Sequence, residues 1–100
     1  MPTEAMQFAA VIERIAREII DNTAPVSIAL IRQMMWRGLC MSDPMDAHMI
    51  DSRGIIARGR SADVAEGVQS FLDKRPAKFV DKVSTDMPDY FPWWPERPYS

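Results

Sequence analysis

Residues Ser61–Phe79 read SADVAEGVQSFLDKRPAKF and have the features of one helix with defined ends. Ser61 is the expected N-cap, because its hydroxyl can accept a hydrogen bond from an amide left free in the first turn. Arg75-Pro76 is the expected end, since the residue before a proline is pushed out of the helical region. The sequence therefore predicts a helix over residues 62–75. Its apolar stripe consists of Val64, Val68, Phe71 and Leu72.

Three more helices are predicted before this one, over residues 4–21, 25–37 and 44–59. Thr3 and Asp43 can cap the first and the third of them. Pro25 suits the first turn of the second, where a missing amide costs nothing. The first helix carries apolar residues at helical spacing, which predicts an amphipathic helix packed into the core. These residues are Phe8, Val11, Ile12, Ile15 and Ile19.

The predicted helix over residues 25–37 is apolar nearly all round. Its only polar side chains belong to Ser27, Arg32, Gln33 and Arg37. A helix that is apolar on most sides needs neighbours on most sides. Four short helices from one chain can hardly supply them all, so we expect another subunit, or a further part of a longer chain, to cover this helix.

Residues 78–100 are predicted to form an extended tail. Four prolines (Pro88, Pro92, Pro95 and Pro98) exclude helix and sheet interior there. The tail is also rich in aromatic residues, which favours packing over an apolar surface. Nothing in the chain alternates with the period of two that strands require. The predicted fold class is therefore all-α, with about four helices and an extended tail rich in proline and aromatic residues.

Composition excludes several function classes. The 100 residues contain 12 Lys and Arg and 14 Asp and Glu, a net charge of -2, which argues against a general nucleic-acid binder. No apolar run approaches the roughly 20 residues of a membrane span. The N-terminal residues lack the order of a secretory signal. A single cysteine cannot form an internal disulfide, which fits a reducing compartment. We expect a cytoplasmic protein that binds neither nucleic acid nor membrane.

Catalytic and metal-ligating signals are weak. Cys40 and His48 could form a nucleophile and base, but the sequence offers no third, orienting group, and a buried thiol with a core histidine is the simpler interpretation. A small enzyme that uses Cys40 is thus the weakest functional hypothesis. Asp43, Asp46 and Asp51 fit no calcium-loop pattern, and one His with one Cys is too few for a transition-metal site. No metal site is predicted.

The run RGIIARGR, residues 53–60, is rich in arginine. The simple interpretation is a solvated helix end. The alternative is an electropositive patch for an anionic ligand, formed together with Lys74, Arg75 and Lys78.

The opening stretch also resembles a known motif. SADVAEGVQSFLDKRPAKF is similar to the C-terminal end of the enoyl-CoA hydratase/isomerase (crotonase) superfamily, which typically reads S-x-D-x-x-E-G-x-x-A-F-x-E-K-R-x-P-x-F. Ser70 and Asp73 are mild departures from it. Residues 22–30 and 32–39 resemble the helix that follows the catalytic core, and MPDYFPWWPERPY resembles an extension in one subgroup. The matching residues are Ser61, Asp63, Glu66, Gly67, Phe71, Lys74, Arg75 and Phe79.

The resemblance implies that the chemistry lies outside this chain. In the family, an N-terminal β/α spiral core supplies the oxyanion hole and the acidic side chains that hydrate or isomerise acyl-CoA thioesters in fatty-acid metabolism. No residue here corresponds to those acids, so no catalytic residue is carried over, and whether the chain is itself an enzyme stays open. No covalently bound cofactor is expected, and a coenzyme A thioester is the expected substrate of the parent enzyme.

The resemblance also implies a supporting role. The family's C-terminal helices form the trimer interface and close over the acyl-CoA site, so residues 1–79 are expected to be a helical oligomerisation and lid region, with residues 80–100 as a tail packed on the body or on a partner. Phe71 and Lys74 are the candidate coenzyme A contacts. From the residues alone, Phe71 is a core residue and Lys74 a surface charge that complements the helix dipole.

The sequence thus predicts an all-α, C-terminal part of an enoyl-CoA hydratase/isomerase-like protein, inactive without its catalytic core. Its expected partner is either a second copy, as in a homo-oligomer such as a trimer, or that core. The alternative of a different class is a free-standing helical interaction module, whose binding surface would be the second helix and the aromatic tail.

Overall fold

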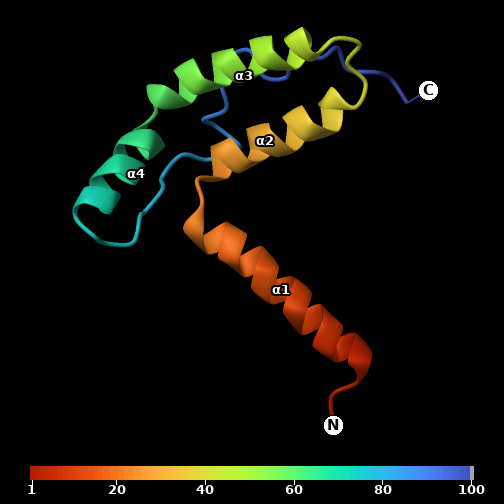
Figure 1. Cartoon of the computed structure of the whole chain (residues 1–100), viewed down its shortest axis with the longest axis vertical. Coiled ribbons are helices and arrows are strands. Elements are labelled where there is room, and N and C mark those ends of the chain that lie inside the picture. The colour runs from red at the N-terminus through yellow and green to blue at the C-terminus, as the bar shows by residue number, and fades with distance from the viewer. Residues whose placement is uncertain (100) are drawn as a thin grey trace.

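The computed structural model describes residues 1–99, which form four α-helices joined by short connections (Figure 1). No strand occurs within these residues, so the predicted all-α class is confirmed. The first three helices begin as predicted and end within one residue of their predicted ends. The helices are α1 (Glu4–Asn22), α2 (Pro25–Gly38), α3 (Pro44–Gly59) and α4 (Ala62–Leu72).

The predicted helix starts are confirmed by their hydrogen bonds. The Thr3 hydroxyl accepts a hydrogen bond from the Met6 amide at 3.1 Å, and the Asp43 carboxylate accepts one from the Met45 amide at 2.8 Å. Helix α2 has no side-chain cap and begins with Pro25, whose missing amide needs no partner. Local sequence therefore fixes where each of these helices begins.

The small core lies between α2 and α3. These helices pack side by side, and α4 packs against α3 (Figure 1). Among the described residues, the buried apolar side chains are Val26, Leu30 and Ile50, which are 0%, 4% and 8% exposed. Although 47% of the residues are hydrophobic, most of that surface is uncovered in this chain.

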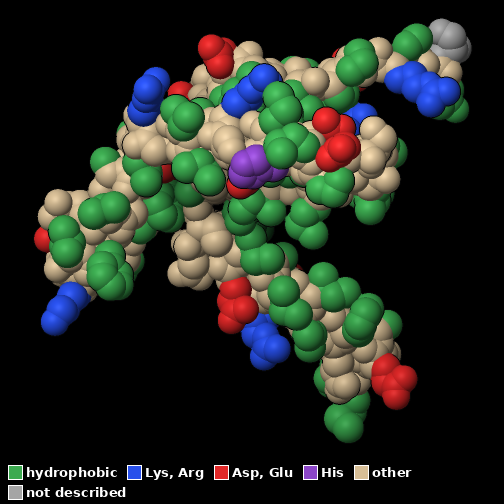
Figure 2. Space-filling view, turned by 45° about the horizontal axis from the view of Figure 1, so that its top comes forward, with side chains coloured by type: hydrophobic (Ala, Val, Ile, Leu, Met, Phe, Trp, Pro, Cys, Tyr) green, Lys and Arg blue, Asp and Glu red, His purple; other side chains and the backbone are tan. Residues whose placement is uncertain are grey.

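Helix α1 extends away from the other three helices as an arm (Figure 1). None of its residues is buried, and Phe8 at the outer part of its apolar stripe is 68% exposed. The expectation that this helix packs into a core is therefore wrong within the chain. The apolar spacing predicts the helix correctly, but the chain supplies no surface to receive the stripe. Figure 2 shows hydrophobic side chains exposed along this arm.

The dimensions agree with an uncovered surface. The radius of gyration is 17.1 Å, whereas a compact domain of 100 residues has about 13 Å. On α2, Met35 and Trp36 are 72% and 65% exposed, although Val26 and Leu30 on the same helix are buried. The chain thus covers one side of α2 and leaves the other open, in keeping with a helix that needs more neighbours than the chain provides.

Residues 76–99 contain no helix and return across α3 and the end of α2 (Figure 1). The Tyr90 hydroxyl lies 3.2 Å from where a Cβ on Gly54 would stand, so the tail approaches α3 closely here and a side chain at this position would require Tyr90 to shift. The Trp94 ring stacks on the guanidinium of Arg37 on α2, with 4.1 Å between the ring centroid and Arg37 Cζ. Aromatic residues anchor the tail to α2 and α3. Within residues 1–99, no helix is long and apolar enough to cross a membrane.

Candidate functional site

The polar face of α4 holds the chain segment that returns from its end. Asp63 is 1% exposed, and its Oδ1 accepts hydrogen bonds from the amides of Val80 at 2.7 Å and Asp81 at 3.1 Å. Arg58 lies between the carboxylates of Asp63 and Asp81, since its Nη2 is 3.7 Å from Asp63 Oδ2 and 3.0 Å from Asp81 Oδ2. The end of α3, the start of α4 and the returning segment are therefore tied together by one buried charge cluster.

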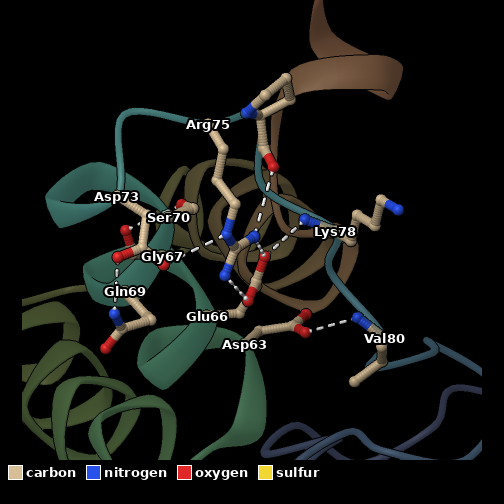
Figure 3. Close-up of polar contacts among 10 residues, drawn as sticks. Asp63, Glu66, Gly67, Gln69, Ser70, Asp73, Arg75, Lys78 and Val80 are labelled. Atoms are coloured by element: carbon tan, nitrogen blue, oxygen red, sulfur yellow. Dashed lines mark hydrogen bonds and ion pairs between the residues drawn. The ribbon is translucent and has the colours of Figure 1, made fainter.

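Glu66 makes the second contact between α4 and the returning segment (Figure 3). Its two carboxylate oxygens face Arg75 Nη1 at 2.6 Å and Nη2 at 3.0 Å, a bidentate pair. Its Oε2 also accepts a hydrogen bond from the Lys78 amide at 2.8 Å. The Arg75 guanidinium, and after it the Lys78 amide, lower the pKa of Glu66 from its ordinary 4.5 to about 2. We call Asp63 and Glu66, with the groups they bind, the carboxylate clamp.

Helix α4 ends at Leu72, three residues before the predicted end. Lys74 adopts a left-handed conformation with φ of 54°, the Lys74 amide donates to the Phe71 carbonyl, and the Arg75 amide donates to the Ser70 carbonyl at 3.0 Å. These two bonds form a Schellman motif, which satisfies carbonyls at the helix end. The helix is therefore closed by this motif before Pro76 can act, and the prediction that the proline stops it is wrong.

The apolar stripe of α4 faces outward. The residues buried on this helix are polar, Asp63 and Ser70, because that face binds the returning segment. The interpretation of Phe71 as a core residue is wrong, since its side chain is 82% exposed. All four stripe residues, Val64, Val68, Phe71 and Leu72, are exposed.

The two predicted coenzyme A contacts lie at the same end of α4. Phe71 is in the last turn, and Lys74 is exposed at the Schellman turn. Both side chains are accessible, and neither takes part in the carboxylate clamp. Their roles in ligand binding stay predictions.

The predicted electropositive patch loses two members. Arg58 forms ion pairs with Asp63 and Asp81. Arg75 forms an ion pair with Glu66, and its Nε lies 3.4 Å from Asp73 Oδ2. Charges that are neutralised inside the chain are poor anchors for an anion. What remains of the proposed patch is Arg53, Arg60, Lys74 and Lys78.

The weaker chemical signals gain no support from the geometry. Cys40 and His48 are both exposed, so the interpretation of a buried thiol and a core histidine is wrong. Across residues 1–99, no three His, Cys, Asp or Glu side chains come together in a group that could hold a metal ion.

The chain is similar to fungal proteins described as enoyl-CoA hydratases. It is 39% identical over 69 residues to enoyl-CoA hydratase AFT3-1 and to enoyl-CoA hydratase ACTT3, both of Alternaria alternata. The match covers 69% of this chain and 23% of each relative, so the chain spans about a quarter of the length of these relatives. No family model matches the chain. The similarity supports a crotonase-like relationship over that part of the chain.

The structure gives most of the recognised motif a structural role. Ser61 caps α4 by accepting from the Val64 amide at 3.2 Å. Phe79 lies against Gly67, with the ring 3.7 Å from where a Cβ would stand. The side chains of five matching residues, and the lack of one at Gly67, thus shape α4 and its returning segment, whereas Phe71 and Lys74 have exposed side chains and Lys74 contributes only its backbone to the turn. The six are Ser61, Asp63, Glu66, Gly67, Arg75 and Phe79.

Sequence reasoning missed the carboxylate clamp. The sequence identifies Asp63 and Glu66 only as matches to the family motif, with no binding partner assigned to them. Their spacing of three places them on one face, next to Ser70, where the helix carries no apolar side chain. A polar face of a short helix followed by a proline-containing segment was the signal that a returning backbone would bind there.

The pH dependence of Glu66 tests the clamp. The pKa of Glu66 in the folded chain is lowered to about 2, so its contacts stabilise the fold fully above the ordinary pKa of 4.5. This stabilisation is lost as the pH falls from 4.5 to about 2. An NMR titration of the Glu66 side-chain carbonyl carbon is expected to have its midpoint near 2. The Glu66→Gln variant should be less stable than the natural chain at pH 6, and the difference in stability should shrink toward pH 2. The Glu13→Gln variant on exposed α1 is the control and should be as stable as the natural chain at both pH values. A Glu66 midpoint near 4.5 would contradict the clamp.

The left-handed residue at the end of α4 gives a second prediction. Replacing Lys74 by glycine should raise the free energy of unfolding by about 1 kcal/mol, because glycine adopts a positive φ without steric cost. Lys74→Ala is the matched control, since it removes the charge but keeps the strain. Urea unfolding followed by circular dichroism measures both variants. Equal stabilities for the glycine and alanine variants would refute the strained turn.

Proposed function

We propose that this chain is the C-terminal, oligomerising part of an enoyl-CoA hydratase/isomerase-like protein that acts on acyl-CoA thioesters. The observation that carries the proposal is the 39% identity over 69 residues to proteins described as enoyl-CoA hydratases. The recognised motif supports it further, because six of its eight residues shape one structural unit made of α4 and the segment that returns from it.

The exposed apolar surface favours a chain that works as part of an assembly over one that works alone. The stripes of α1 and α4 are both exposed, and large exposed apolar patches mark interaction sites. In the proposal, a catalytic core or further copies of the chain cover these stripes. A homo-oligomer, such as a trimer, is the arrangement that the resemblance favours.

The proposed activity needs groups that this chain does not offer in a free state. Hydration of an unsaturated thioester requires stabilisation of the enolate oxygen and a carboxylate or other group that moves the proton. The motif carboxylates Asp63 and Glu66 are engaged by backbone amides and arginines. We therefore propose that the chain alone does not turn over an acyl-CoA and that its part is to complete the site.

Phe71 and Lys74 are the residues we propose to meet coenzyme A. An aromatic face can lie against the adenine ring or the pantetheine arm, and an ammonium group can pair with a phosphate. Both side chains are exposed at one end of α4, which leaves them available to a ligand held mainly by a neighbouring part of the assembly.

A chimera tests the activity. This chain replaces the matched segment of enoyl-CoA hydratase AFT3-1, and hydration of crotonyl-CoA is followed by loss of the enoyl thioester absorbance. We expect the chimera to be active and the isolated chain to be inactive. In the chimera, Phe71→Ala and Lys74→Gln should each raise KM about three- to tenfold, the size of one modest contact.

The matched control is Lys82→Gln, which removes an exposed lysine of the tail and should leave KM unchanged. Turnover by the isolated chain would overturn the supporting role. Equal KM values for the Lys74 and Lys82 variants would overturn the assignment of Lys74.

A free-standing helical interaction module is the second candidate, and the exposed stripe of α1 favours it. Light scattering after size exclusion bears on both candidates, because the homo-oligomer predicts self-association of the chain. Ile12→Glu on the stripe should shift the chain toward monomer, since a charge in a covered apolar contact is costly. Ala10→Glu, on the opposite face of α1, should not. A stable monomer in the natural chain would exclude the homo-oligomer and leave the catalytic core or a different protein as the partner.

A further inference from the structure

A pocket of about 400 Å³ opens where the end of α2, the start of α3 and the aromatic tail meet. This volume lies in the range of small-molecule sites. The pocket is remote in sequence from Phe71 and Lys74, and none of the proposed coenzyme A contacts lines it. Its polar and aromatic walls are formed by Arg37, Cys40, Asp46, Arg53, Trp93 and Trp94.

Two arginines give the pocket a positive charge. Neither Arg37 nor Arg53 has a carboxylate within ion-pair distance among residues 1–99, whereas Arg58 and Arg75 are both neutralised inside the chain. One lining residue, Asp46, is acidic. The wall therefore carries two positive charges and one negative charge, which favours a ligand with a single negative charge.

Arg37 is held in place by the tail. Its guanidinium carbon lies 4.1 Å from the centroid of the Trp94 ring, a cation–π contact. Stacking on a ring face leaves the edge of a guanidinium, which carries its N–H donors, free to meet a planar oxyanion. The tryptophan thus orients the arginine without neutralising it.

Three N–H donors around the pocket have no acceptor. Arg37 Nε, Trp93 Nε1 and Trp94 Nε1 are buried and unpaired within residues 1–99. Buried donors are normally satisfied, and leaving one unpaired costs about 1–3 kcal/mol. These three nitrogens have almost no solvent-accessible area, so they lie behind the pocket wall, and the cations that line the pocket are Arg37 and Arg53.

The remaining walls suit a flat apolar group. Trp93 and Trp94 meet edge to face, with centroids 4.9 Å apart and ring planes at 89°. Two indole surfaces at right angles form a corner, and Met41, Met49 and Ile50 line the pocket as well. Aromatic rings prefer such offset or edge contacts, and methionine adapts to the shape of a ligand.

We propose that this pocket binds a small aromatic carboxylate, with its carboxylate at Arg37 and Arg53 and its ring against Trp93 and Trp94. The single charge of a carboxylate matches the net charge of the wall, whereas a phosphate dianion meets Asp46 unfavourably. The site is independent of the acyl-CoA proposal, because it shares no residue with it.

Cys40 gives a direct test, because it is the only cysteine of the chain, it is exposed, and it lines the pocket. Iodoacetate carries a carboxylate and iodoacetamide is neutral, yet both alkylate the same thiolate. The ratio of their two rate constants therefore reports the preference of the pocket for a carboxylate and is independent of the thiol's own reactivity. We expect this ratio to be higher for Cys40 than for free cysteine.

Variants of the lining residues should move the ratio in opposite directions. Arg53→Gln and Arg37→Gln should each lower it by roughly two- to fivefold, the size expected for one partly exposed charge contact. Asp46→Asn should raise it by a similar factor. Arg32→Gln, which removes an exposed arginine of α2 outside the pocket, is the matched control and should leave it unchanged. The proposal fails if the Arg53 and Arg32 variants give the same ratio.

Equilibrium binding identifies the ligand class. Quenching of tryptophan fluorescence in the full chain is measured with phenylacetate, acetate, benzyl alcohol and phenyl phosphate. Phenylacetate should saturate the signal and bind more tightly than the other three, and Arg53→Gln should weaken it severalfold while Arg32→Gln does not. Equal binding of benzyl alcohol would overturn the role of the arginines. Tighter binding of phenyl phosphate would overturn the carboxylate assignment, and absence of a saturable change would overturn the site.

Discussion

The structure depends on the carboxylate clamp of α4. Two carboxylates three residues apart, Asp63 and Glu66, bind the backbone amides of the segment that returns from the helix. The Schellman turn reverses the chain after Leu72, this contact holds the returning segment on α4, and the aromatic contacts then hold the tail on α2 and α3. The bidentate pair with Arg75 fixes the turn, while Arg58 makes burial of Asp63 tolerable by placing a positive charge beside it. These contacts tie the end of α3, α4 and the first part of the returning segment into one unit.

A second constraint is the shortage of buried apolar surface. Val26, Leu30 and Ile50 form the core, and burial of each side chain stabilises the fold by only about 1.5–3 kcal/mol. Such a core is small against the conformational entropy that about 100 ordered residues lose. The exposed stripes of α1 and α4 are therefore the surface that we propose a partner covers. This is a physical reason for an assembly that is separate from the similarity to the enoyl-CoA hydratases.

Sequence reasoning predicted the local features and missed the directions in which helices face. Thr3, Pro25, Asp43 and Ser61 mark helix starts through their own side chains, so these starts could be read directly. The end of α4 could not, because a lysine in the left-handed region carries no sequence signal comparable to glycine. The spacing of apolar residues predicted the stripe of α1. Whether a stripe is covered depends on the surfaces of other elements, and the residues of the stripe say nothing about those surfaces. Phe71 was misjudged for the same reason.

The arginines show how internal pairing separates structural charges from available ones. The sequence groups Arg53, Arg58 and Arg75 as parts of one positive patch, but the fold neutralises the last two within the clamp. Arg53 instead shares a pocket with Arg37, which lies some 16 positions earlier in the chain and on another helix. Charge density along the sequence was therefore a poor guide to where an anion could bind. The better guide is which cations stay unpaired after the fold has formed its own ion pairs, and two of these, Arg37 and Arg53, line the pocket with the tryptophans of the tail.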